Sequence, residues 1–247
     1  MYKLITAISI SFLCCQSPYV QKGTENIVLY DTEIKDSFEV RIDSYRDRTY
    51  KTPYDTIVFY FDASLKSGKY LREFYSDSAH RNTLLVGIAH FGNYRTKRRR
   101  DLMGNNDYMK HLLDSGIIPH IQKNYGWAKE RMIIGHSFGG LWVYRNFFTT
   151  DSLFTTFISI SPSLWVEGTT SPQEYSKQVT LDSLRTLFMY WGGGEEFNYV
   201  KGACNKAMTE IVSNGILSKK ITLQELKNET HNSTLVPAIK SYYNKNE

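Results

Sequence analysis

Short apolar runs that alternate with segments of helical periodicity constrain this chain most strongly. The runs are rich in β-branched and aromatic residues, as in Thr56–Phe61, and have the length of buried strands. Between them, apolar residues recur three and four positions apart, which indicates helices packed on a sheet. The alternation predicts an α/β fold with a mostly parallel central sheet and helices on both faces. The expected strands are 37–46, 56–61, 84–89, 131–134, 157–160, 187–191 and 221–226.

The composition is that of one folded domain. With 41% hydrophobic and 22% charged residues, the 247-residue chain has a globular mix, which excludes a disordered chain. No apolar run after the first twenty residues reaches the roughly 18 residues that span a bilayer. No repeat or linker divides the sequence, so we expect a single domain over residues 21–247. Helices are expected near 70–74, 108–121, 141–147, 203–212 and 235–243, the second with a break near Gly116 and Pro119.

Residues 1–20 have the pattern of an export signal. A short basic start precedes the apolar stretch from Leu4 to Cys15, which has about the length of a signal h-region. The stretch ends in two cysteines and resembles a bacterial lipoprotein signal, so Cys15 is the expected lipidation site and Cys14 the alternative. A plain secretory signal and a buried first strand are the other interpretations. We expect an exported protein, periplasmic or attached to the outer membrane through Cys15.

The positive charge is local. Residues 95–100 carry five positive charges, which account for the whole net charge of +5. A nucleic-acid-binding domain spreads Lys and Arg over a face, so we expect no nucleic acid partner. The run is predicted as a loop at the edge of the sheet, where Arg98 would contact an anionic substrate. Among the three cysteines no C-x-x-C pair occurs, so neither a zinc site nor a redox pair is expected.

The pentapeptide Gly135-His136-Ser137-Phe138-Gly139 carries the chemistry. It has the G-x-S-x-G pattern and lies between an expected strand and an expected helix, as a nucleophile elbow requires. Glycines permit the tight turn, which exposes the Ser137 hydroxyl and places the Phe138 N–H at a helix N-terminus, aimed at an oxyanion. The His136 side chain is expected to point away from Ser137, and His136 is a candidate for substrate binding. The alternative is a glycine-rich turn without chemistry.

A serine alcohol needs a base, and in this fold class the acid and then the histidine follow the serine in the chain. His231 is the only histidine after the last expected strand. Glu195 and Glu196 both follow strand 187–191, and either could orient the His231 ring; Asp182 is held in reserve. A second oxyanion donor is expected in the loop after strand 56–61, from the backbone N–H of Ala63 or Ser64.

Together these motifs resemble the enterochelin esterase and esterase D group of α/β-hydrolases, from about residue 37 to the C-terminus. The spacing of Gly192 and Glu195 resembles the family's Gly-x-x-Glu and favours Glu195 over Glu196. Ala63 departs from the pattern, since the family commonly has glycine there. The other marks are Phe59-Tyr60-Phe61-Asp62, Val86-Gly87-Ile88, Arg98-Arg99-Arg100-Asp101, the elbow with Gly140, Ser161-Pro162-Ser163-Leu164-Trp165 and His231-Asn232-Ser233.

The resemblance implies an α/β-hydrolase fold and a serine carboxyl-ester hydrolase with the triad Ser137, His231 and Glu195. It implies acyl transfer without a metal or an organic cofactor, on a siderophore, feruloyl or acetyl-sugar ester, which is a small-molecule or glycan substrate. Trp165 is expected to form a wall of the acyl or alcohol pocket. The alternative is a non-catalytic carbohydrate- or siderophore-binding protein on the same fold. The oligomeric state is not predicted.

Overall fold

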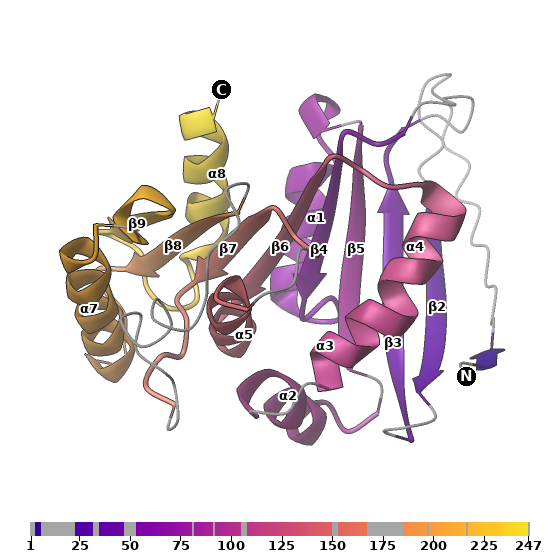
Figure 1. Ribbon diagram of the computed structural model, residues 1–247, viewed down its shortest axis with the longest axis horizontal. Helices are drawn as coiled ribbons and strands as arrows, with labels where there is room; N and C mark the ends of the chain where they lie inside the picture. Colours follow the sequence, from indigo (N-terminus) through magenta and orange to yellow (C-terminus); the bar gives the residue numbers. More distant parts are fainter. Residues whose placement is uncertain are drawn as a thin grey trace. The chain divides into compact units, whose positions relative to one another are not determined.

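A computed structural model describes most of the chain, and these residues form two compact units (Figure 1). The first unit comprises residues 1–101 and 106–131, and the second comprises 102–105 and 132–247. The lipidation candidates Cys14 and Cys15 and the reserve acid Asp182 lie outside the described residues, so export and lipidation stay predictions. The described ranges are 3–5, 23–31, 35–46, 53–80, 82–90, 92–104, 108–149, 153–166, 185–196, 198–215 and 217–246.

The first unit holds a mixed sheet in the order β1-β2-β3-β5-β4. β4 and β5 are parallel, whereas β1, β2 and β3 are joined to the sheet by antiparallel pairing. The sequence did not predict β2, although Ile27 and Leu29 alternate as buried residues; β1 falls in the segment for which a buried first strand was one interpretation. The strands are β1 (Lys3–Ile5), β2 (Gly23–Asp31), β3 (Asp36–Ser44), β4 (Thr56–Phe61) and β5 (Thr83–His90).

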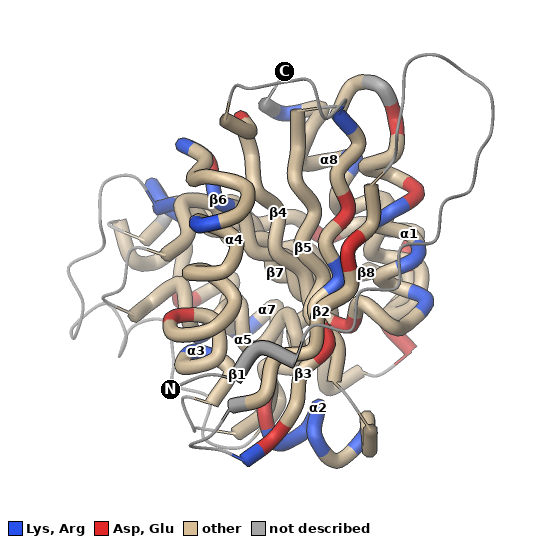
Figure 2. Tube along the Cα trace, turned by 90° about the vertical axis from the view of Figure 1, so that its right-hand side faces the viewer, with Lys and Arg blue, Asp and Glu red and all other residues tan. Residues whose placement is uncertain are grey.

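Helices cover both faces of this sheet, with α1 on one side and α3 and α4 on the other (Figures 1 and 2). The expected break at Gly116 and Pro119 is instead a π-helical turn, in which the Ile118 N–H donates to the Leu113 carbonyl. The wider turn admits Pro119, which has no N–H, without ending the helix. The helical segments are α1 (Lys66–Tyr75), η1 (Ser78–His80), α2 (Tyr94–Met103), α3 (Tyr108–Leu112), η2 (Leu113–Ile117) and α4 (Ile118–Tyr125).

The second unit holds the parallel strands β6-β7-β8-β9. Phe157 of β7 packs on Phe147 of α5, with ring centres 5.5 Å apart. Phe188 of β8 packs on Tyr242 of α8, with ring centres 4.8 Å apart. Phe188 pairs in register with the residue after Phe157, so the side chains of Phe157 and Phe188 point to opposite faces of the sheet. Helices α5 and α8 therefore cover opposite faces. The elements are β6 (Glu130–His136), α5 (Phe138–Phe147), β7 (Thr156–Ile160), β8 (Thr186–Gly192), α7 (Asn198–Ser213), η3 (Leu217–Lys219), β9 (Ile221–Leu226) and α8 (Leu235–Asn246).

None of the helices formed by the described residues combines the length and the apolar character that a membrane crossing requires.

A buried arginine fixes the C-terminal end of α5, the helix that follows the G-x-S-x-G turn. Arg185 is 2% exposed, and its guanidinium donates to the carbonyl oxygens of Asn146, at 2.8 Å, and Thr149. Its centre lies 4.9 Å from the Phe157 ring centre. A cation at this end complements the partial negative charge of the helix C-terminus, so Arg185 secures α5 against the sheet.

Replacement of Arg185 by Met should lower the free energy of unfolding by about 2–3 kcal/mol, because buried carbonyls lose charge-assisted hydrogen bonds. Urea denaturation measures the change. The matched control is Arg99→Met, which removes the same charge from an exposed position of α2 and should change stability by less than about 0.5 kcal/mol. Equal effects of the two substitutions would contradict the capping role.

Candidate active site

Ser137 forms a strained turn between β6 and α5, as the sequence pattern predicts. Its φ of 60° and ψ of −117° are rare for a residue with a side chain and cost about 1–3 kcal/mol. Three backbone hydrogen bonds hold the turn. The Ser137 N–H donates to Ile160 O at 3.0 Å, and Ser137 O accepts from the N–H groups of Leu141, at 2.9 Å, and Ser163, at 3.2 Å.

Glycines around the serine allow close approach of α5 to the sheet. A Cβ on Gly135 would overlap the Gly139 carbonyl oxygen, and a Cβ on Gly140 would lie 2.8 Å from Ile160 O. Both contacts are with backbone atoms, which cannot move aside cheaply. The elbow therefore needs glycine at these two positions for packing rather than for unusual dihedral angles.

His231 and Glu195 form a hydrogen-bonded pair in the second unit. The distance from His231 Nδ1 to Glu195 Oε2 is 2.9 Å, and the Glu195 side chain is fully buried. The other carboxylate oxygen accepts from the Gly192 N–H at 3.2 Å. Glu196 is exposed and lies 3.5 Å from the Asn232 amide instead. Of the two carboxylates that the sequence offered, Glu195 is the one that contacts the histidine ring.

The surroundings keep the Glu195 carboxylate ionised. Burial raises its pKa, but the hydrogen bond from His231 and the neighbouring Ser161 hydroxyl outweigh burial, and the pKa lies below its ordinary value of 4.5. An ionised carboxylate only accepts hydrogen bonds, so His231 carries its proton on Nδ1. The Nε2 atom then has the lone pair that a general base needs.

The turn that carries His231 is anchored at two sides. The Gly194 N–H donates to Glu229 O at 3.0 Å, which ties the turn to the end of β8. On the other side, His136 Nε2 lies 2.7 Å from the carbonyl oxygen of His231, and the two ring centres are 4.7 Å apart. Because His136 immediately precedes Ser137, this contact places His231 beside the elbow.

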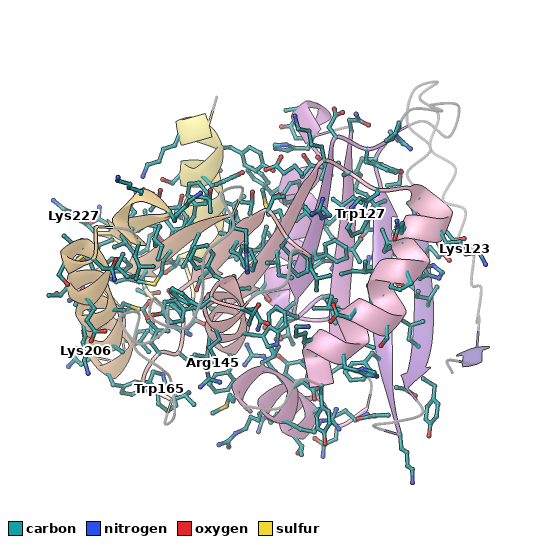
Figure 3. All side chains as sticks on the ribbon, in the orientation of Figure 1. Lys123, Trp127, Arg145, Trp165, Lys206 and Lys227 are labelled. Carbon is teal, nitrogen blue, oxygen red and sulfur yellow. The ribbon has the colours of Figure 1, made fainter. Side chains whose placement is uncertain are left out.

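Exposed aromatic side chains adjoin the elbow. The Trp165 ring centre lies 6.4 Å from that of Phe138 and 5.0 Å from that of Tyr199, which it meets edge to face. Trp165 is 43% exposed and Tyr199 is 51% exposed. Trp165 lies on the turn whose Ser163 N–H binds Ser137, and Figure 3 shows it beneath α5 and α7. The sequence did not single out Tyr199, because one tyrosine in the first turn of a helix has no distinguishing pattern.

The N–H groups of Ala63 and Ser64, the two candidates for the second oxyanion hydrogen bond, lie in the first unit, and one of them already has a backbone partner. The Ala63 N–H donates to Ile88 O at 3.1 Å. The Ser64 N–H has no hydrogen bond to any residue that the structure describes, and Ser64 is exposed. Of the two, only Ser64 offers an N–H to a ligand.

The basic run is a helix, α2, so the prediction of a loop is wrong. Arg98 makes two hydrogen bonds to the buried Asp62, at 2.7 and 2.8 Å. Lys97 and Arg100 both bind Asp36, the latter at 2.7 Å. These cations are paired with carboxylates of their own unit; Arg98 holds Asp62, and its contact with an anionic substrate stays a prediction. Asp36 and Asp62 lie too far away in the sequence for the pattern to reveal the pairing.

Among the described residues, no group of three or more His, Cys, Asp and Glu side chains could hold a metal ion.

Solved structures share the fold of this chain at low sequence identity. No family model and no curated protein matches the sequence. The siderophore hydrolase EstA from Aspergillus nidulans is 17% identical, with 97% of this chain and 100% of that chain covered and a TM-score of 0.72. The BES protein from Bacillus cereus is 17% identical, with 93% and 97% covered and a TM-score of 0.71. An IroE-like serine hydrolase from Shewanella oneidensis is 18% identical, with 90% and 78% covered and a TM-score of 0.71. The predicted α/β-hydrolase fold is thereby confirmed.

The Glu195→Gln substitution should flatten the acid limb of the stability curve. The pKa of Glu195 in the folded state lies below the ordinary value of 4.5, so the ionised carboxylate stabilises the fold fully at pH values above 4.5. This contribution is lost as the pH falls through the folded-state pKa. The variant has no proton to take up, so its free energy of unfolding should change less between about pH 5 and pH 3. Urea denaturation across this range measures the effect. Glu196→Gln should keep the wild-type pH dependence, and a wild-type curve for Glu195→Gln would contradict the pairing.

Proposed function

We propose that this protein is a serine carboxyl-ester hydrolase in which Ser137 is the nucleophile, His231 the general base and Glu195 the residue that orients the base. The observation that carries the proposal is the position of His231. Its ring is bound to Glu195 at 2.9 Å, and its backbone is bound at 2.7 Å to the residue that precedes Ser137. A serine on a strained strand-to-helix turn, next to an oriented imidazole, is the arrangement that nucleophilic acyl transfer requires.

The proposed reaction has two stages. His231 Nε2 takes the Ser137 proton while Ser137 Oγ attacks the ester carbonyl, and the resulting imidazolium is stabilised by ionised Glu195. The Phe138 N–H, in the first turn of α5, stabilises the oxyanion together with the dipole of that helix. The Ser64 N–H stays the sequence's prediction for the second oxyanion hydrogen bond. The tetrahedral intermediate expels the alcohol, which takes the proton from His231, and the acyl group stays bound to Ser137 Oγ. Water that gives its proton to the same histidine then attacks this acyl-enzyme, and the acid leaves as Ser137 takes the proton back.

The names of the structural neighbours support an esterase. They include the enterobactin and salmochelin hydrolase IroE, which was also solved in complex with DFP, and a ferulic acid esterase. These activities belong to proteins that are at most 16% identical to this chain, so the residues on the elbow carry the argument and the neighbours agree with it.

We further propose a substrate with a flat aromatic group, as in catecholate siderophores or feruloyl esters. The Trp165 ring lies next to Phe138 and meets Tyr199 edge to face, and large exposed rings favour stacking with aromatic ligands. The runner-up function is a binding protein on the same fold that uses the aromatic surface without chemistry. Export and a lipidated Cys15 complete the proposal as predictions from the sequence.

Replacement of Ser137 by Ala should lower kcat for a short p-nitrophenyl ester by at least about a thousandfold, because the variant has no nucleophile. The matched control is Ser241→Ala on α8, whose hydroxyl binds Gln224 and which should hydrolyse the ester at the wild-type rate. If wild-type protein and Ser137→Ala are equally slow with several acyl chains, the esterase proposal fails and the binding protein gains support.

Truncation of Trp165 to Ala should raise KM for methyl ferulate about tenfold and leave KM for p-nitrophenyl acetate within about twofold, because only the aromatic ester loses a stacking partner. Steady-state kinetics with the two esters give the comparison. Val212→Ala, at an exposed apolar position of α7, is the control and should change neither value. A parallel rise in KM for both esters would contradict an aromatic subsite.

A further inference from the structure

We propose that His136 is a positioning residue, which holds the main chain of His231 so that the base stays in reach of Ser137. The inference rests on the proposed function and deepens it. In the sequence, His136 is only the variable residue of the G-x-S-x-G motif, and we expected it at most to touch substrate. The structure gives it a defined partner, the backbone of the histidine that carries the proton.

The geometry fixes which atom donates. His136 Nε2 lies 2.7 Å from the His231 carbonyl oxygen, and a carbonyl oxygen can only accept. His136 therefore carries a proton on Nε2. The two rings are tilted by 47° with centres 4.7 Å apart, so the imidazole of His136 also packs against the ring that it positions.

Two further hydrogen bonds of the His231 turn lie within the turn. Within the turn, the Thr230 N–H donates to Ser233 Oγ at 2.9 Å and the Thr234 N–H donates to Thr230 O at 3.1 Å. These bonds shape the turn itself. Glu195 orients the imidazole through Nδ1, but Glu195 follows β8, a different strand from the one that ends at the serine.

His136 is the last residue of β6, and Ser137 is the next residue in the chain. A hydrogen bond from this strand end to the His231 backbone gives nucleophile and base a common support. Proton transfer requires a separation of about 2.6–3.2 Å, and a displacement near 1 Å costs about a hundredfold in rate. Loss of the bond should therefore slow the chemical step and leave substrate affinity nearly unchanged.

Two amide substitutions separate the hydrogen bond from general effects of polarity. The side-chain nitrogen of Gln takes the place of histidine Nε2, whereas Asn is one methylene shorter and cannot reach the His231 carbonyl. His136→Gln should keep kcat within about fivefold of wild type. His136→Asn and His136→Leu should lower kcat about a hundredfold, with KM changed by less than about threefold. The rate of labelling by a fluorophosphonate, which reports serine reactivity without ester binding, should fall in parallel with kcat.

The outcomes are distinguishable. Equal kcat values for the Gln and Asn variants overturn the proposal, whether both equal wild type or both are slow, because only Gln keeps the hydrogen bond. A change in KM alone also overturns it and makes His136 a substrate contact. Thermal unfolding of each variant shows whether a slow variant is folded. If wild-type protein itself does not react with the fluorophosphonate, the proposed function fails, and this result is separate from any difference between the variants.

Discussion

The strained backbone of Ser137 is the constraint on which the second unit depends. A side-chain-bearing residue at a φ of 60° persists only where its surroundings hold it, and here the surroundings are the backbone of β7, the turn after β7 and the first turn of α5. Each of these groups makes a hydrogen bond to Ser137. The absence of side chains at Gly135 and Gly140 brings α5 close enough for that arrangement, and Arg185 secures the other end of the helix.

Electrostatics decide what the elbow can do. A buried carboxylate is unfavourable unless it is paired, and Glu195 is paired with His231 and with a backbone N–H. The same hydrogen bond that stabilises the carboxylate determines which nitrogen of His231 carries the lone pair that accepts a proton. In the proposed mechanism, stability and chemistry therefore depend on one contact, and His136 sets the position of the main chain that carries the ring.

Local patterns predicted much of this molecule. Strands Thr56–Phe61 and Ile221–Leu226 have the bounds that the sequence indicated, and the elbow lies between a strand and a helix as the glycines required. The resemblance of Gly192 and Glu195 to the family's Gly-x-x-Glu singled out Glu195, which follows the end of β8 within the same short segment.

Local sequence patterns could not predict the contacts between segments that lie far apart in the chain. The run at 95–100 was interpreted as a loop, since its high charge gives no apolar face, yet it is a helix whose cations bind Asp36 and Asp62. The bond from His136 ends on a backbone carbonyl, which has no sequence signature.

The central claim, covalent catalysis by Ser137, is tested most directly by acid-quenching the protein during turnover of an aromatic ester and locating the acyl group by peptide mass spectrometry. The account predicts one acyl adduct, on the peptide that contains Ser137. An adduct on another residue, or turnover without any adduct in a variant slowed at deacylation, would contradict it.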